Sequence, residues 1–119
     1  MTVKNYRELM VWQKAMHLAE SVYQATRTFP AEERFGLTSQ VRRAAVSIAA
    51  NIAEGQARQS TAEFLRFLSI ANGSRAEVET HILLARRLNY VTSDIENELP
   101  GQTAQVARML YGLRNSLKK

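Results

Sequence analysis

The stretch that decides the fold is RRAAVSIAANIAEG, which runs from Arg42 to Gly55. At helical spacing, one narrow arc of this segment and the residues before it forms a core stripe: Leu37, Val41, Ala44, Ile48 and Ile52. The nearly opposite side is also apolar: Val46, Ala50 and Ala53, flanked by Ala45 and Ala49. A helix that is apolar or small over most of its circumference is contacted on more than one side.

Three other segments show the same helical spacing of apolar residues, and the predicted helices span about residues 5–28, 38–54, 60–88 and 93–117. Asn5 is suited to cap the first helix, and Gly55 is suited to end the second. Capping-box signals at Ser60 and Ser93 begin the third and fourth, and Pro100 is expected to interrupt the fourth. Short loops and the absence of any strand candidate predict an all-α fold, an antiparallel up-down four-helix bundle with a single domain over residues 1–119.

The second apolar face of the second helix predicts a subunit interface. Four helices do not easily bury every face of one of their members, so a second chain is the natural partner. The residues assigned to this interface are Val46, Ala49, Ala50 and Ala53. The alternative is a tightly packed monomer in which the alanines line close contacts within the chain.

Polar residues also fall inside the apolar arc of the third helix. Asn72, Arg75 and Glu79 lie there, and Arg43 and Glu54 of the second helix need partners as well. Charged groups in a core-facing stripe are costly unless they are paired. We predict a polar layer that joins the two helices, within one chain or between chains. Ordinary pairing between residues one turn apart at the edge of the stripe explains the pattern equally well.

The composition is that of a globular protein, with 45% hydrophobic residues, 23% charged residues and no cysteine. The lack of cysteine excludes disulfides and thiolate metal sites, and no apolar run approaches the length of a membrane span. We therefore expect a cytoplasmic protein without membrane partners.

The net charge is +5, and arginine supplies 12 of the 16 basic residues. Arginine offers a planar fork for phosphates, and the tail after residue 107 contains basic residues but no acid. The residues assigned to a candidate nucleic-acid surface are Arg58, Arg66, Arg87, Arg108, Arg114, Lys118 and Lys119. Mere solubility is the simpler explanation of such a charge.

The sequence shows no pattern typical of an active site. His17 and His81 are isolated from other metal ligands, and no serine has an identifiable base. We expect no catalytic residues, no cofactor and no metal, and a protein that is not an enzyme.

Three blocks of sequence carry a resemblance to a known family: YRELMVWQKAMHLA near the N-terminus, FPAEERFGLTSQVRRAAVSIAANIAEG in the middle, and EFLRFLSIANGSRAEVET after it. They closely resemble the bacterial four-helix-bundle family first noticed in rRNA intervening sequences, over roughly residues 6–117. That family is related to the accessory protein of diversity-generating retroelements. Two departures are Ala49, where many relatives have proline, and Pro100-Gly101.

The resemblance implies a ring-like homopentamer without known catalysis. It also implies nucleic acid, RNA or DNA, and a reverse transcriptase or another protein as partners. The function expected from the sequence is thus a non-enzymatic oligomer with a basic surface that binds nucleic acid. The alternative is a structural or protein-interaction module with no nucleic-acid role.

Overall fold

The computed structural model describes residues 5–91 and 93–118, with the backbone alone described for residues 93–97. It contains four α-helices: α1 (Met10–Thr26), α2 (Leu37–Ala57), α3 (Thr61–Arg87) and α4 (Ser93–Leu117). Two short 3-10 turns, η1 (Tyr6–Glu8) and η2 (Ala31–Glu33), precede α1 and α2. The described residues contain no strand, and the predicted all-α fold with four helices is confirmed.

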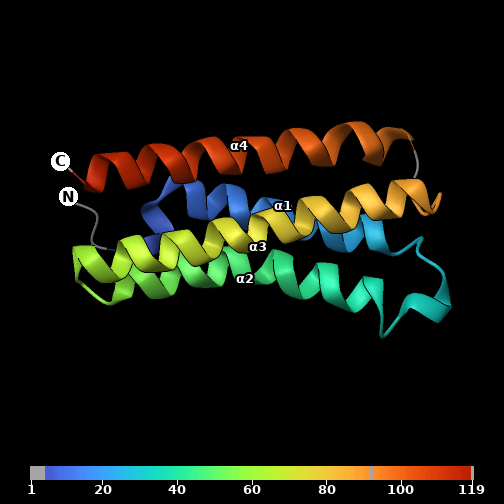
Figure 1. The fold of residues 1–119 in the computed structure, drawn as a ribbon, viewed down its shortest axis with the longest axis horizontal. Coiled ribbons are helices and arrows are strands. Elements are labelled where there is room, and N and C mark those ends of the chain that lie inside the picture. The colour runs from blue at the N-terminus through green and yellow to red at the C-terminus, as the bar shows by residue number, and fades with distance from the viewer. Residues whose placement is uncertain (1–4, 92, 119) are drawn as a thin grey trace.

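The helices lie side by side along the long axis of a molecule that measures 44 × 25 × 19 Å (Figure 1). Helix α1 packs against α2 and α4, and α3 packs against the same two helices. Figure 1 shows that α2 and α3 run in opposite directions. The start of α1, the α2–α3 turn and the end of α4 share one end of the bundle, and the two other connections share the opposite end.

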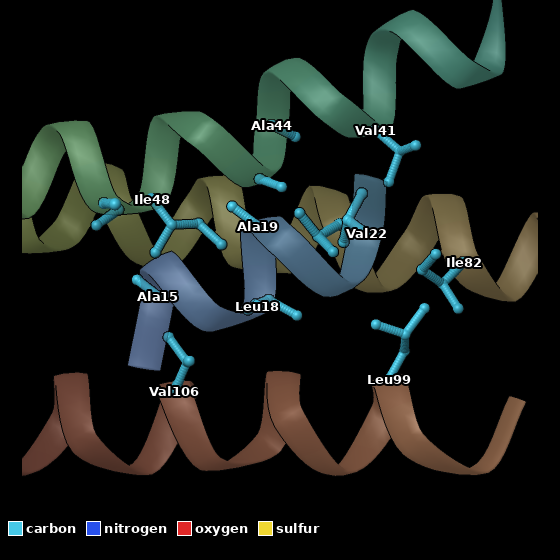
Figure 2. Close-up of a cluster of buried hydrophobic side chains, with 14 of the residues drawn as sticks. Ala15, Leu18, Ala19, Val22, Val41, Ala44, Ile48, Ile82, Leu99 and Val106 are labelled. Carbon is cyan, nitrogen blue, oxygen red and sulfur yellow. The ribbon is translucent and has the colours of Figure 1, made fainter. Parts of the chain in front are cut away.

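The core is built from the predicted stripes. Leu18, Ile48, Leu68 and Leu110 come from the four different helices, and all are almost completely buried. Figure 2 shows how side chains from α1 fill the space between α2 and α4, with Val106 beside Ala15. Burying one such side chain stabilises the fold by about 1.5–3 kcal/mol, so these apolar stripes hold the four helices together.

The first helix begins later than Asn5. The Asn5 side chain accepts a hydrogen bond from the backbone N–H of Arg7 at 2.9 Å, so it caps η1. Leu9 then adopts an extended conformation, and α1 begins at Met10 without a side-chain cap. Asn5 is thus a cap, as predicted, but of a separate turn rather than of α1.

Gly55 does not end α2, contrary to the prediction. The helix continues to Ala57, and the reversal comes at Gln59, which has a positive φ of 56°. A β-carbon added to Gly55 would lie only 2.6 Å from Cβ of Phe67 and 3.1 Å from Cδ1 of Phe64. The glycine is therefore needed because α3 passes so close to α2 at this point.

Pro100 does not interrupt α4. The helix is continuous from Ser93, although proline lacks the backbone N–H that would normally bond one turn back. Leu99 is 2% exposed and points toward Ile82 of α3 (Figure 2), and this packing holds the second turn of α4 in place. The side chain of Ser93, the predicted cap of α4, is outside the part of the chain whose side chains are described.

The Glu33 side chain links the α1–α2 connection to the α3–α4 connection, at one end of the bundle. One carboxylate oxygen accepts the backbone N–H of Leu37 at 3.1 Å, at the start of α2. The other accepts the hydroxyl of Tyr90 at 3.0 Å, from the α3–α4 connection. The hydrogen bond to Glu33 raises the pKa of Tyr90. A single carboxylate thus joins two connections that are 57 residues apart in the chain.

Gly55→Ala is expected to lower the free energy of unfolding by about 1–3 kcal/mol, because the new methyl group must displace Phe67. The matched control is Gly73→Ala in the middle of α3, where an added β-carbon meets no atom within 4 Å. That change should raise the free energy of unfolding by about 0.5–1 kcal/mol, because alanine favours the helix. Urea unfolding at one fixed protein concentration measures both. Equal changes in the free energy of unfolding for the two variants would contradict the close approach of α3 to α2 at Gly55.

Candidate subunit and nucleic-acid interfaces

An open groove of about 580 Å³ runs between α1 and α2. Its lining is mostly apolar and consists of Tyr6, Trp12, Met16, Ala19, Tyr23, Val46, Ala49, Ala50 and Ala53. The polar residues that line it are Glu20, Gln24 and Arg27. All four residues that the sequence assigned to a subunit interface therefore line the same groove.

The groove exists because α2 places small side chains opposite large ones. Ala49 is 4% exposed and forms part of the floor, whereas Val46 is 47% exposed. Met16 and Tyr23 on α1 are 41% and 43% exposed. Close packing within one chain thus explains Ala49, but it leaves Val46 and the exposed Ala50 without a covering surface from the described residues.

Arg42, the first residue of the stretch that decides the fold, packs against Tyr23, which lines the groove. Its Nε donates a 2.7 Å hydrogen bond to the hydroxyl of Thr26, and its guanidinium lies 4.6 Å from the centre of the Tyr23 ring. Arg42 therefore holds the C-terminal end of α1 against α2. The sequence did not predict this role, because nothing in the local pattern pairs Arg42 with a threonine 16 residues earlier.

The predicted polar residues make separate contacts within one chain. Arg75 donates to Asn72 at 3.1 Å and lies 3.5 Å from Glu79, all within α3. Glu54 of α2 pairs with Arg58, the residue that follows α2, at 3.1 Å, and both side chains are about half exposed. Arg43 is exposed and lies on a different part of α2 from Glu54. The structure thus brings Asn72, Arg75 and Glu79 together, but not with Glu54.

Two serines that the sequence analysis did not select form the polar link between α2 and α3. The hydroxyls of Ser47 and Ser74 lie 2.9 Å apart. Asn51 donates to the carbonyl oxygen of Ser47 at 2.8 Å and to its hydroxyl at 2.9 Å. A single serine on each helix carries no charge that would mark it as a contact, so no signal in the sequence singles out the pair.

Four of the candidate nucleic-acid residues gather at one end of the bundle. Arg58 and Arg66 flank the α2–α3 turn, and Arg114 and Lys118 lie in the last residues of the chain, at the same end (Figure 1). Arg108 is exposed further back along α4. Arg87, at the end of α3, lies at the opposite end of the bundle. Lys119 lies outside the described residues.

Arg58 and Arg66 share one aromatic ring. Their guanidinium carbons lie 5.2 and 4.5 Å from the centre of Phe67, which is itself buried. Each arginine also meets a carboxylate one turn away: Arg58 meets Glu54, and Arg66 meets Glu63 at 2.9 Å. The hydrogen bond from Arg66 lowers the pKa of Glu63. Both arginines are therefore held in place at the surface, although each is partly neutralised.

Comparison with known proteins identifies the family. Residues 7–112 match the family model described as 23S rRNA-intervening sequence protein. The chain belongs to this family. A similar solved structure is a protein of unknown function from the S23 ribosomal protein family of Bacteroides thetaiotaomicron, with a TM-score of 0.78 and 25% sequence identity. The match covers 88% of this chain and 98% of that one. No protein with a curated description matches the sequence.

Within the described part of the chain, no three histidine, aspartate or glutamate side chains form a group able to hold a metal ion. Over the same residues, no helix combines the length and apolar character that crossing a membrane requires.

The Arg75–Glu79 pair is expected to behave as a surface ion pair in this family member. The Glu79 side chain is 46% exposed, so Glu79→Ala should lower the free energy of unfolding by less than about 1 kcal/mol. Urea melts of Glu79→Ala, Arg75→Ala and the double variant measure the coupling. Glu54→Ala is the matched control at a pair in which both side chains are about half exposed, whereas the Arg75 side chain is 15% exposed. A loss of about 3–5 kcal/mol for Glu79→Ala would instead mean that assembly buries the pair.

Proposed function

We propose that this protein is a non-enzymatic oligomer, a homopentamer, that binds nucleic acid through basic surfaces gathered by assembly. The observation that carries the proposal is the open apolar groove between α1 and α2. It contains all four residues that the sequence assigned to a subunit interface.

Self-association is supported by the side chains that the groove leaves exposed. Val46, Met16 and Tyr23 each expose more than 40% of their surface in one continuous lining. Contiguous exposed apolar surface marks interaction sites in proteins. The alanines allow a helix of a second copy to approach closely, and ring assembly by a repeated contact gives a closed oligomer such as a pentamer.

Nucleic-acid binding is supported by the basic end of the bundle. Arg58 and Arg66 at the α2–α3 turn lie at the same end as Arg114 and Lys118 of α4. Five copies of a chain with a net charge of +5 would carry about +25, and assembly would multiply weak phosphate contacts. Binding of this kind is tolerant of sequence, because phosphate contacts do not read bases.

The second candidate function is a structural or protein-interaction module with no nucleic-acid role, for which a reverse transcriptase or another protein is the partner. One observation favours it. Arg58 and Arg66 already pair with Glu54 and Glu63, which reduces the positive charge that they offer to a phosphate.

Ala50→Glu is expected to shift the assembled protein toward monomer, because it places a charge in the apolar groove. Light scattering coupled to size-exclusion chromatography at micromolar concentration measures the change. Ala76→Glu is the matched control, since Ala76 is exposed on α3 and does not line the groove. Circular dichroism checks that both variants remain helical. A wild-type protein that is a stable monomer at this concentration would refute the oligomer.

Binding to short RNA and DNA should weaken steeply between about 50 and 200 mM salt, as expected when phosphate contacts release counterions. Changing Arg108, Arg114, Lys118 and Lys119 to glutamine should weaken binding. The slope of log K against log salt concentration should become shallower by about one unit for each lost phosphate contact. Fluorescence anisotropy measures both effects.

The matched comparison is Lys118→Gln against Arg34→Gln, each of which removes one exposed charge, at opposite ends of the bundle. An equal loss in both variants would mean that binding follows net charge rather than the basic end. A complete lack of binding at the lowest salt concentration would favour the interaction module.

A further inference from the structure

A second depression, which we call the α2–α3 notch, lies on the other flank of α2. It has a volume of about 400 Å³, and its polar lining comes from two helices: Gln40, Arg43 and Ser47 on α2, and Ser74, Glu77 and His81 on α3. None of these residues lines the α1–α2 groove, and none belongs to the basic end of the bundle. The notch is thus a separate feature.

The hydrogen bond between Ser47 and Ser74 sets the register of the notch. Because α2 and α3 run in opposite directions, residues that precede Ser47 lie beside residues that follow Ser74 (Figure 1). Arg43 is one turn before Ser47, and Gln40 is one turn further, toward His81. Side chains one turn apart lie on the same face of a helix, so each helix lines the notch with one continuous stripe.

Several hydrogen-bond donors of the notch have no acceptor among the described residues. The two serine hydroxyls carry two protons and use one in their mutual hydrogen bond, so one proton is free for another acceptor. Nδ1 of His81 is shielded from solvent and has no hydrogen-bond partner in the described part of the chain. Because Nδ1 is closed to solvent, a ligand in the notch would meet the other ring nitrogen of His81, Nε2.

The notch lining carries one positive charge, on Arg43, and one negative charge, on Glu77. Arg43 is exposed, and the described residues form no ion pair with it. A guanidinium, an imidazole, a hydroxyl and the Gln40 amide therefore converge from two helices, against the single carboxylate of Glu77. Donors that approach from several directions suit a tetrahedral oxyanion with several oxygen atoms, and arginine binds phosphate through two of its N–H groups.

We propose that the α2–α3 notch binds a phosphate group. Arg43 contacts two phosphate oxygens, and the free hydroxyl proton of the serine pair and the His81 imidazole contact the others. Glu77 lines the same notch. The volume also admits the sugar of a nucleotide, since small-ligand sites begin at about 300 Å³. The phosphate comes either from a small phosphate ester or from a nucleic-acid backbone. The proposal does not depend on the basic end of the bundle.

Broadening of the ³¹P NMR signal of inorganic phosphate, and of a nucleoside monophosphate, reports binding by the assembled protein. Arg43→Gln should weaken binding by at least about 10- to 100-fold, because it removes charge-assisted hydrogen bonds to two phosphate oxygens. Arg34→Gln makes the same change of charge at an exposed position outside the notch and should leave binding within about twofold. His81→Gln is the second test variant if Arg43→Gln disturbs the helices in circular dichroism.

A short oligonucleotide distinguishes the two sources of phosphate. If it displaces the small phosphate, and Arg43→Gln weakens its binding too, the backbone of a nucleic acid is the ligand. If it does not compete, a small phosphate ester is the ligand. Because changes at Arg58 and Arg66 should leave the ³¹P signal broadened, failure of the basic end is distinguishable from failure of the notch. No broadening at millimolar phosphate, or equal losses in Arg43→Gln and Arg34→Gln, would overturn the proposal.

Discussion

The close packing of α2 against α3 is the contact on which the rest of the structure depends. At one end the two backbones approach so closely that only glycine fits at position 55, against Phe67. Near the middle, the hydroxyls of Ser47 and Ser74 meet at 2.9 Å. Small residues on the α3 side of α2 make this approach possible, and a different set of small residues, Ala49, Ala50 and Ala53, lines the groove beside α1.

Much of the fold was predictable because helical periodicity and serine caps act over a few residues. Ser60 caps α3 as predicted, with its side chain accepting the backbone N–H of Glu63 at 3.3 Å. The local rules failed at Gly55 and Pro100, where contacts from another helix decide the outcome. Glycine often ends a helix, but here it makes room for Phe67, and packing of Leu99 keeps the proline within a helix.

The candidate sites were predictable to different degrees for a similar reason. The apolar face of α2 follows from its own spacing, so Val46, Ala49, Ala50 and Ala53 were assigned to a surface that the structure shows as one groove. Polar contacts depend on the register between helices, which no single segment contains. Arg43 was selected for its charge, but its neighbours Ser74 and His81 on α3 follow only from the fold. Helix α2 thus presents an apolar flank toward α1 and a polar flank toward α3.

The carboxylate of Glu33 gives the two ends of the bundle different responses to alkali. Its hydrogen bond raises the pKa of Tyr90, so the neutral phenol is favoured in the folded chain. This contribution to stability is fully present below the pKa that tyrosine has when unfolded, about 10, and it is lost as the pH rises through the higher folded value. Above that point a phenolate faces a carboxylate and the two repel. Strong base would therefore weaken this link between the two long connections, whereas the α2–α3 turn contains no tyrosine to ionise.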